Sequence, residues 1–162
     1  MGETYPWLSE VVNAIRSVYG TDLVSLAVFG SWARGKATPV SDLDLLVVAD
    51  PLPVGRGARM KQFTGVDALT AATRRSVWGP EHPPLELSPV IKTPSEVRHG
   101  SPLFLDMTEW VTLLIDRDDF LARYLDDLRE RMIRNGTERR MAKGGYYWVY
   151  KPDAKPGEVI TL

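Results

Sequence analysis

Two aspartates separated by one residue are the first candidates for chemistry in this sequence. Asp42 and Asp44 stand at the start of an apolar run over residues 43–48, which is typical of a buried strand. Alternate side chains of a strand share one face, so the two carboxylates point toward the same place. Like charges this close repel each other unless a cation lies between them, and oxygen ligands favour Mg²⁺ or Mn²⁺. The pair predicts a metal site suited to phosphate chemistry.

A second candidate lies ten residues upstream, in the stretch VFGSWARGKA (residues 28–37). The stretch nearly matches a P-loop, but Ala37 stands where the hydroxyl residue of that motif should be. A P-loop also runs directly into a long helix, and here only a few residues, Pro39 among them, precede the next predicted strand. The sequence therefore argues against an ATPase loop.

The same stretch fits a different way of holding phosphates. Gly30 would allow the backbone to approach a phosphate closely, and Ser31 adds a hydroxyl and an N–H at the start of a short helical turn. We expect this turn to hold the β- and γ-phosphates of a nucleotide beside the metal.

Read together, Gly30-Ser31, ten residues, and Asp42-x-Asp44 form a G-S-x₁₀-D-x-D signature. This signature resembles that of nucleotidyltransferases of the DNA polymerase β superfamily. The stretch GSWARGKATPVSDLDLLVV is most similar to the small prokaryotic members, the minimal nucleotidyltransferases, which also carry Ala-Arg-Gly after the Gly-Ser pair. The resemblance implies the α/β (α+β) fold of polymerase β-like nucleotidyltransferases, with a mixed central sheet of about four to five strands flanked by helices.

The resemblance also implies a reaction. An acceptor hydroxyl would attack the α-phosphate of a nucleoside triphosphate, most often ATP, and release pyrophosphate. Asp42 and Asp44 would hold two Mg²⁺ or Mn²⁺ ions. The family has a third carboxylate on a neighbouring strand, for which Glu86 is the best candidate, as metal ligand and as base. The superfamily more often has Asp there, and the alternative is that Glu86 is a surface carboxylate on an edge strand.

Several other residues have weaker functional interpretations. Arg34 and Lys36 could neutralise the triphosphate, or they could form salt bridges and face solvent. Trp32 is expected to pack beneath the Gly-Ser turn. The C-terminal aromatics could stack on a base, but a buried cluster or a dimer interface is favoured. A basic cluster could bind RNA or a partner, or it could be a solvated face. The C-terminal aromatics are Tyr146, Tyr147, Trp148 and Tyr150. The basic cluster consists of Arg129, Arg131, Arg134, Arg139, Arg140 and Lys143.

The elements that must position these residues follow from apolar periodicity and from glycine and proline breaks. Helices are predicted over residues 5–19 and 58–77 and from about 118 to 135, and strands over 23–29, 43–48, 85–91, 110–115 and 144–150. Pro89 predicts that the third of these strands lies at an edge or contains a bulge. We expect a catalytic core over residues 1–115, with residues 116–162 forming a C-terminal helix, an aromatic strand and a tail packed on the same domain.

The composition limits the remaining alternatives. The chain has 162 residues, no cysteine, two histidines and a net charge of −1, so disulfides and thiolate metal sites are excluded, and no overall charge attracts nucleic acid. No long apolar run or leader-like start is present, which predicts a cytoplasmic protein with no membrane partner.

The acceptor stays open at this stage: it could be a protein, an RNA or a small molecule. One alternative is an antitoxin of a two-gene module that binds or adenylylates a helical toxin. Another is a nucleotide-binding protein without catalysis. A homodimer is also compatible with the sequence.

Overall fold

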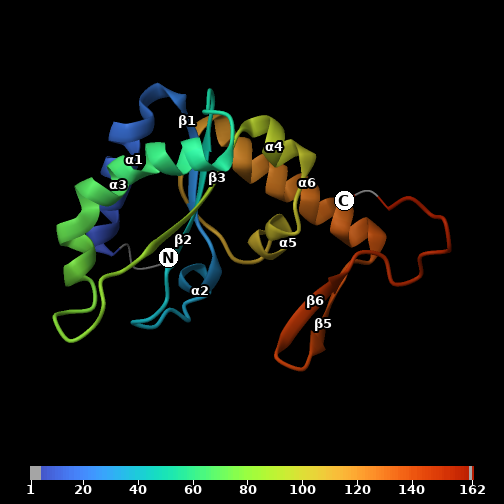
Figure 1. Cartoon of the computed structure of the whole chain (residues 1–162). Helices are drawn as coiled ribbons and strands as arrows, with labels where there is room; N and C mark the ends of the chain where they lie inside the picture. Colours follow the sequence, from blue (N-terminus) through green and yellow to red (C-terminus); the bar gives the residue numbers. More distant parts are fainter. Residues whose placement is uncertain (1–4, 161) are drawn as a thin grey trace.

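The computed structural model describes residues 5–160 and 162. Its helices and strands alternate along the first half of the chain, whereas two helices and later two strands follow each other directly in the second half (Figure 1). They are α1 (Pro6–Tyr19), β1 (Leu23–Val28), α2 (Gly30–Ala33), β2 (Leu43–Ala49), α3 (Arg56–Ser76), β3 (Leu87–Lys92), α4 (Pro94–His99), α5 (Leu103–Met107), β4 (Thr112–Asp116), α6 (Phe120–Asn135), β5 (Glu138–Ala142) and β6 (Gly145–Val149).

The central sheet is mixed and has four strands in the order β3-β2-β1-β4. Strand β1 runs antiparallel to both β2 and β4, whereas β2 and β3 are parallel. Pro89 lies in β3 at the edge of the sheet, where its missing N–H is tolerated, as predicted. The predicted fold class, a mixed sheet flanked by helices, is confirmed.

Helices cover both faces of this sheet (Figure 1). On one face, α1 and α3 pack against alternate residues of β2, such as Leu45 and Val47. On the other face, α4, α5 and α6 pack against Leu46 and Val48. The two faces of β2 are therefore both buried, which is why its sequence is almost continuously apolar.

The C-terminal helix α6 is an integral part of the second core. Its stripe Leu121, Leu125, Leu128 and Met132 is buried, and Gly136 ends the helix with φ +63°, a conformation that glycine adopts without strain. Beyond it, β5 and β6 form a separate two-stranded antiparallel sheet below α5 and α6 in Figure 1.

The sequence did not predict three elements, α4, α5 and β5. Helices α4 and α5 are short and bounded by Pro94, Gly100 and Pro102, so they present no long apolar stripe. Strand β5 is exposed throughout and rich in charge. None of the helices in the described ranges combines the length and apolar character needed to cross a bilayer.

Candidate active site

The antiparallel pairing of β1 and β2 brings the phosphate turn to the aspartates. Val28 at the end of β1 pairs with Leu45, and the Phe29 N–H donates to the Asp44 carbonyl at 3.1 Å. Gly30 and Ser31 then open α2, a single turn. The turn predicted from Gly30-Ser31 is thus placed directly against the start of β2, and no long helix follows Lys36, which confirms that this is not a P-loop.

Gly30 lies so close to Asp44 that no side chain fits there. A Cβ atom on Gly30 would lie 2.0 Å from Oδ2 of Asp44, and the residue has φ +66°. Real Cβ atoms essentially never approach another heavy atom this closely, so any other residue would displace the carboxylate. Glycine at position 30 therefore leaves free the space that the Asp44 carboxylate occupies.

The electrostatics around Asp44 fit a cation site. Asp44 is half-buried on β2, and this burial, followed by the charge of Asp42, raises the pKa of its carboxyl. A hydrogen bond from Ser88 and the charge of Arg34 act in the opposite direction on the same pKa. A bound divalent cation would relieve the repulsion, and the oxygen donors suit Mg²⁺ or Mn²⁺.

Ser88 is a site neighbour that the sequence reasoning missed. It pairs with Asp44 in the parallel β2–β3 register, so its hydroxyl reaches the same face. Ser88 could have been found from the sequence, because it lies two residues after Glu86 on a predicted strand and alternate residues of a strand share one face.

Glu86 lies beside the aspartates in register but turns its side chain away from them. It directly precedes Leu87, the partner of Leu43, and its carbonyl accepts from the Leu43 N–H at 2.8 Å. Its carboxylate instead lies 3.5 Å from Nη1 of Arg74 on α3. Within the described residues, no three carboxylate or imidazole side chains gather as a metal site.

The cations near the turn behave differently from each other. Arg34 is partly buried and directed toward the C-terminal hairpin, where its Nη2 donates to the Tyr146 hydroxyl at 2.9 Å and lies 3.6 Å from an Asp106 oxygen. The Lys36 side chain is exposed and forms no ion pair with the described residues. The backbone N–H of Lys36 donates to the Ser31 carbonyl at 2.9 Å.

The aromatic residues form two groups. Trp32 of α2 packs against the α1–α3 core, in edge contact with Tyr5 and Trp7 and tilted against Trp78. This confirms that Trp32 packs beneath the turn. Tyr146 and Trp148 face α5, whereas Tyr147 is exposed.

The arginines of the basic cluster are divided between two elements in the structure. Arg129, Arg131 and Arg134 lie on α6, whereas Arg139 and Arg140 lie on β5. Most of these arginines pair with neighbouring acids: Asp126, Glu130, Glu109 and Glu138 are the partners of Arg129, Arg134, Arg139 and Arg140.

Comparison with known proteins agrees with this geometry. The family model described as a nucleotidyltransferase domain matches residues 8–70, which include the Gly-Ser turn and both aspartates. A candidate protein adenylyltransferase of Methanocaldococcus jannaschii, MJ1305, is 32% identical over 124 residues, 75% of this chain and 78% of the relative. The chain therefore belongs to the nucleotidyltransferase family, and the predicted enzyme class is confirmed.

Further relatives extend the comparison. A second candidate protein adenylyltransferase of the same organism, MJ0604, is 44% identical over 43 residues, 26% of this chain and 43% of that protein. The solved structure of spectinomycin adenyltransferase AAD(9) from Enterococcus faecialis, with ATP and spectinomycin, has a TM-score of 0.53 at 16% identity and covers 82% of this chain and 68% of that one. A toxin-antitoxin structure with AMP-PNP has a TM-score of 0.47 at 13% identity and covers 78% of this chain and 90% of that one.

Proposed function

We propose that this protein transfers AMP from ATP to a hydroxyl group of a protein, in a reaction that depends on a divalent metal ion. The observation that carries the proposal is the close approach of Gly30 to Asp44, which joins the phosphate turn to the carboxylate pair. The names of the two Methanocaldococcus relatives support adenylyl transfer and a protein acceptor.

The residues of the site would have three roles: metal binding, phosphate binding and charge neutralisation. Asp42 and Asp44, with Glu86, would hold the divalent ions. Gly30 and Ser31 would bind the β- and γ-phosphates at the turn, while Arg34 and Lys36 would contribute positive charge. The ions, when bound, neutralise the triphosphate and stabilise charge on the entering and leaving oxygens.

The chemical step is a substitution at the α-phosphorus. The acceptor oxygen forms a bond to this phosphorus, and the bond between the α-phosphorus and the oxygen bridging to the β-phosphate breaks. Pyrophosphate leaves with the electrons of that bond. The proton of the acceptor hydroxyl passes to the Glu86 carboxylate, which acts as general base.

Glu86 can take this role because little holds it in its observed position. Its side chain is 68% exposed, and the contact with Arg74 is an ion pair at 3.5 Å. Arg74 is largely buried, but the Glu86 carboxylate is the exposed member of the pair and its 3.5 Å contact is at the limit of a hydrogen bond, so rotation of the Glu86 side chain toward the site costs little free energy. Its backbone is meanwhile fixed beside β2 by the Leu43 hydrogen bond.

A labelling experiment tests the proposed acceptor class. The protein is incubated with ATP, Mg²⁺ or Mn²⁺ and lysate of its host, and mass spectrometry searches for AMP on tyrosine, serine or threonine. We expect modified proteins with wild type and Glu81→Gln, and at least tenfold fewer with Glu86→Gln. Equal modification by Glu86→Gln would exclude its role as base.

The two alternatives from the sequence make different predictions in this experiment. An antitoxin that acts by modification would place AMP on one small helical protein encoded beside it. A protein that only binds nucleotide would bind ATP and yield no modified acceptor.

A further inference from the structure

The C-terminal hairpin contacts the loop that follows the phosphate turn. Nη2 of Arg34 donates to the hydroxyl of Tyr146 at 2.9 Å, although the two residues are 112 positions apart. The same nitrogen lies 3.6 Å from Oδ2 of Asp106, and the guanidinium carbon lies 5.0 Å from the ring centroid of Trp110. Two segments that are far apart in the sequence thus converge on Arg34.

Asp106 is the anchor of this arrangement. Its Oδ1 accepts hydrogen bonds from the Tyr146 hydroxyl and from the Trp148 indole N–H, both at 2.9 Å. It belongs to α5, whose Leu105 and Met107 are buried in the second core. Asp106 is therefore held by packed neighbours on both sides, and it fixes the inner face of β6.

Tyr146 links the anchor to the arginine. Its hydroxyl donates to Asp106 and accepts from Arg34, so its hydrogen-bonding orientation is fully defined. Burial, and then its hydrogen bond to Asp106, raises the pKa of Tyr146. A phenol is in any case protonated at neutral pH and can donate.

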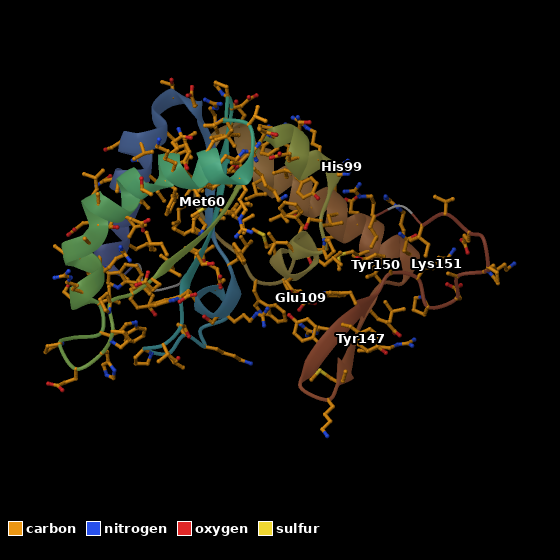
Figure 2. The ribbon with its side chains drawn as sticks, in the orientation of Figure 1. Met60, His99, Glu109, Tyr147, Tyr150 and Lys151 are labelled. Carbon is orange, nitrogen blue, oxygen red and sulfur yellow. The ribbon has the colours of Figure 1, made fainter. Side chains whose placement is uncertain are left out.

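A second arginine holds the hairpin in place. Arg139 of β5 lies over the rings of Trp110 and Tyr146, at 4.6 and 5.0 Å from their centroids, and pairs with Glu109 at 3.1 Å. Figure 2 labels Glu109 and Tyr147 at this junction between the α5 segment and the hairpin.

Arg34 and Asp106 lie on the face of the sheet that carries Asp44. Asp44 lies on the same face of β2 as Leu46 and Val48, which pack against α4, α5 and α6. Helix α5 with Asp106 covers this face, and the Arg34 N–H donates to the Gly30 carbonyl at 3.3 Å. Arg34 is close enough for its charge to lower the pKa of Asp44.

We propose that the β5–β6 hairpin is part of the nucleotide site, in which Asp106 and Tyr146 are positioning residues that hold the Arg34 guanidinium ready for the triphosphate. The inference rests on the proposed function, because it deepens the nucleotide binding of the same site. A free arginine side chain loses rotamer entropy when it binds phosphate, and the hydrogen bond and ring contacts here impose that loss before ATP arrives.

Removal of the Tyr146 hydroxyl tests the inference. For Tyr146→Phe we expect the Kd for a non-hydrolysable ATP analogue with Mg²⁺, and the KM for ATP, to rise on the order of tenfold. The kcat should stay within about twofold, because the metal-binding carboxylates are untouched. Tyr147→Phe, on the exposed face of the same strand, should match wild type. Asp106→Asn provides a second variant with an effect in the same direction, should Tyr146→Phe unfold.

A double-mutant cycle separates positioning from a general structural effect. Adding Tyr146→Phe to Arg34→Ala should cost no further affinity, since the group being positioned is gone. Unchanged or tighter nucleotide binding by Tyr146→Phe and Asp106→Asn, or fully additive losses, would overturn the inference while leaving the proposed function intact. A wild type that binds no ATP would overturn the proposed function, and the inference with it.

Discussion

At the scale of single residues, the candidate site depends on the absence of a side chain at position 30. The G-S-x₁₀-D-x-D spacing predicted that Gly30 and Asp44 act together, and the structure shows the contact behind it, a distance that excludes any Cβ atom. The direction of Glu86 and the destination of Arg34 were not predictable. Both depend on partners, Arg74 and Tyr146, that approach only in the folded chain.

Gly30→Ala should inactivate the enzyme through Asp44. We expect transfer activity to fall at least 100-fold, because the new Cβ atom displaces the Asp44 carboxylate. Gly35→Ala is a matched control, since Gly35 has the same φ of +66° but open space around it. It should lose about 1 kcal/mol of stability from backbone strain while retaining most activity. Equal activities of the two variants, measured beside their thermal unfolding, would contradict the clash.

Asp44→Asn should make the metal-free protein more stable at neutral pH while it abolishes transfer. The folded-state pKa of Asp44 is raised, so the native state binds the proton more tightly and stability falls as pH rises above about 4. The stability gained by Asp44→Asn should therefore be present at pH 7 and vanish below pH 4, where the carboxyl is protonated in both states. Thermal melts across this range test the sign.

Metal binding gives the complementary measurement. Mg²⁺ or Mn²⁺ should raise the Tm of wild type and of Asp50→Asn, at the other end of β2, but not that of Asp44→Asn. A metal-dependent rise of the same size in all three proteins would show that the ion binds elsewhere.

At the scale of elements, the sequence was informative where a stripe or an alternation was long enough. The helix over residues 120–135 and the strands β1 and β2 were predicted within about two residues. The strand β5 was not, because Glu138, Arg139 and Arg140 show no alternation of apolar and polar residues, and the only strand with which β5 pairs among the described residues is β6.

Helix α4 illustrates a short element held by specific polar contacts. Thr93 and Glu96 form a capping box, and Arg59 of α3 pairs with Glu96 at 2.7 Å. The hydrogen bond from Arg59 is the largest cause of a pKa of about 2 for Glu96. Glu96→Gln should thus lose about 1 kcal/mol of stability at pH 7.

The pH dependence distinguishes this contact from a general packing effect. Because the folded pKa is depressed, the stabilisation is present above pH 4.5 and lost as pH falls toward about 2, so the mutant and wild type should converge there. The exposed Glu81→Gln should match wild type throughout. A difference that persists unchanged at low pH would contradict the role of the charge.

At the scale of the whole molecule, we propose that residues 116–162 belong to the same folding unit as the catalytic core over residues 1–115. The α6 stripe is buried in the second core, and Trp148 of the hairpin packs against that core. Unfolding should accordingly follow one transition by calorimetry, far-UV and near-UV dichroism. Separate transitions would show that the C-terminal segment is an independent unit. Light scattering would test the homodimer, which is compatible with the sequence.

The central claim is that this site transfers the adenylyl group of ATP. The most direct test supplies ATP labelled at the α- or the γ-phosphate, with Mg²⁺ or Mn²⁺ and host lysate, to wild type and to an Asp42→Asn/Asp44→Asn double variant. Relative to lysate without added protein, we predict additional protein-bound label from α-labelled ATP with wild type alone, and no additional label from γ-labelled ATP. Additional label from the γ-phosphate, or equal labelling by the double variant, would contradict the claim.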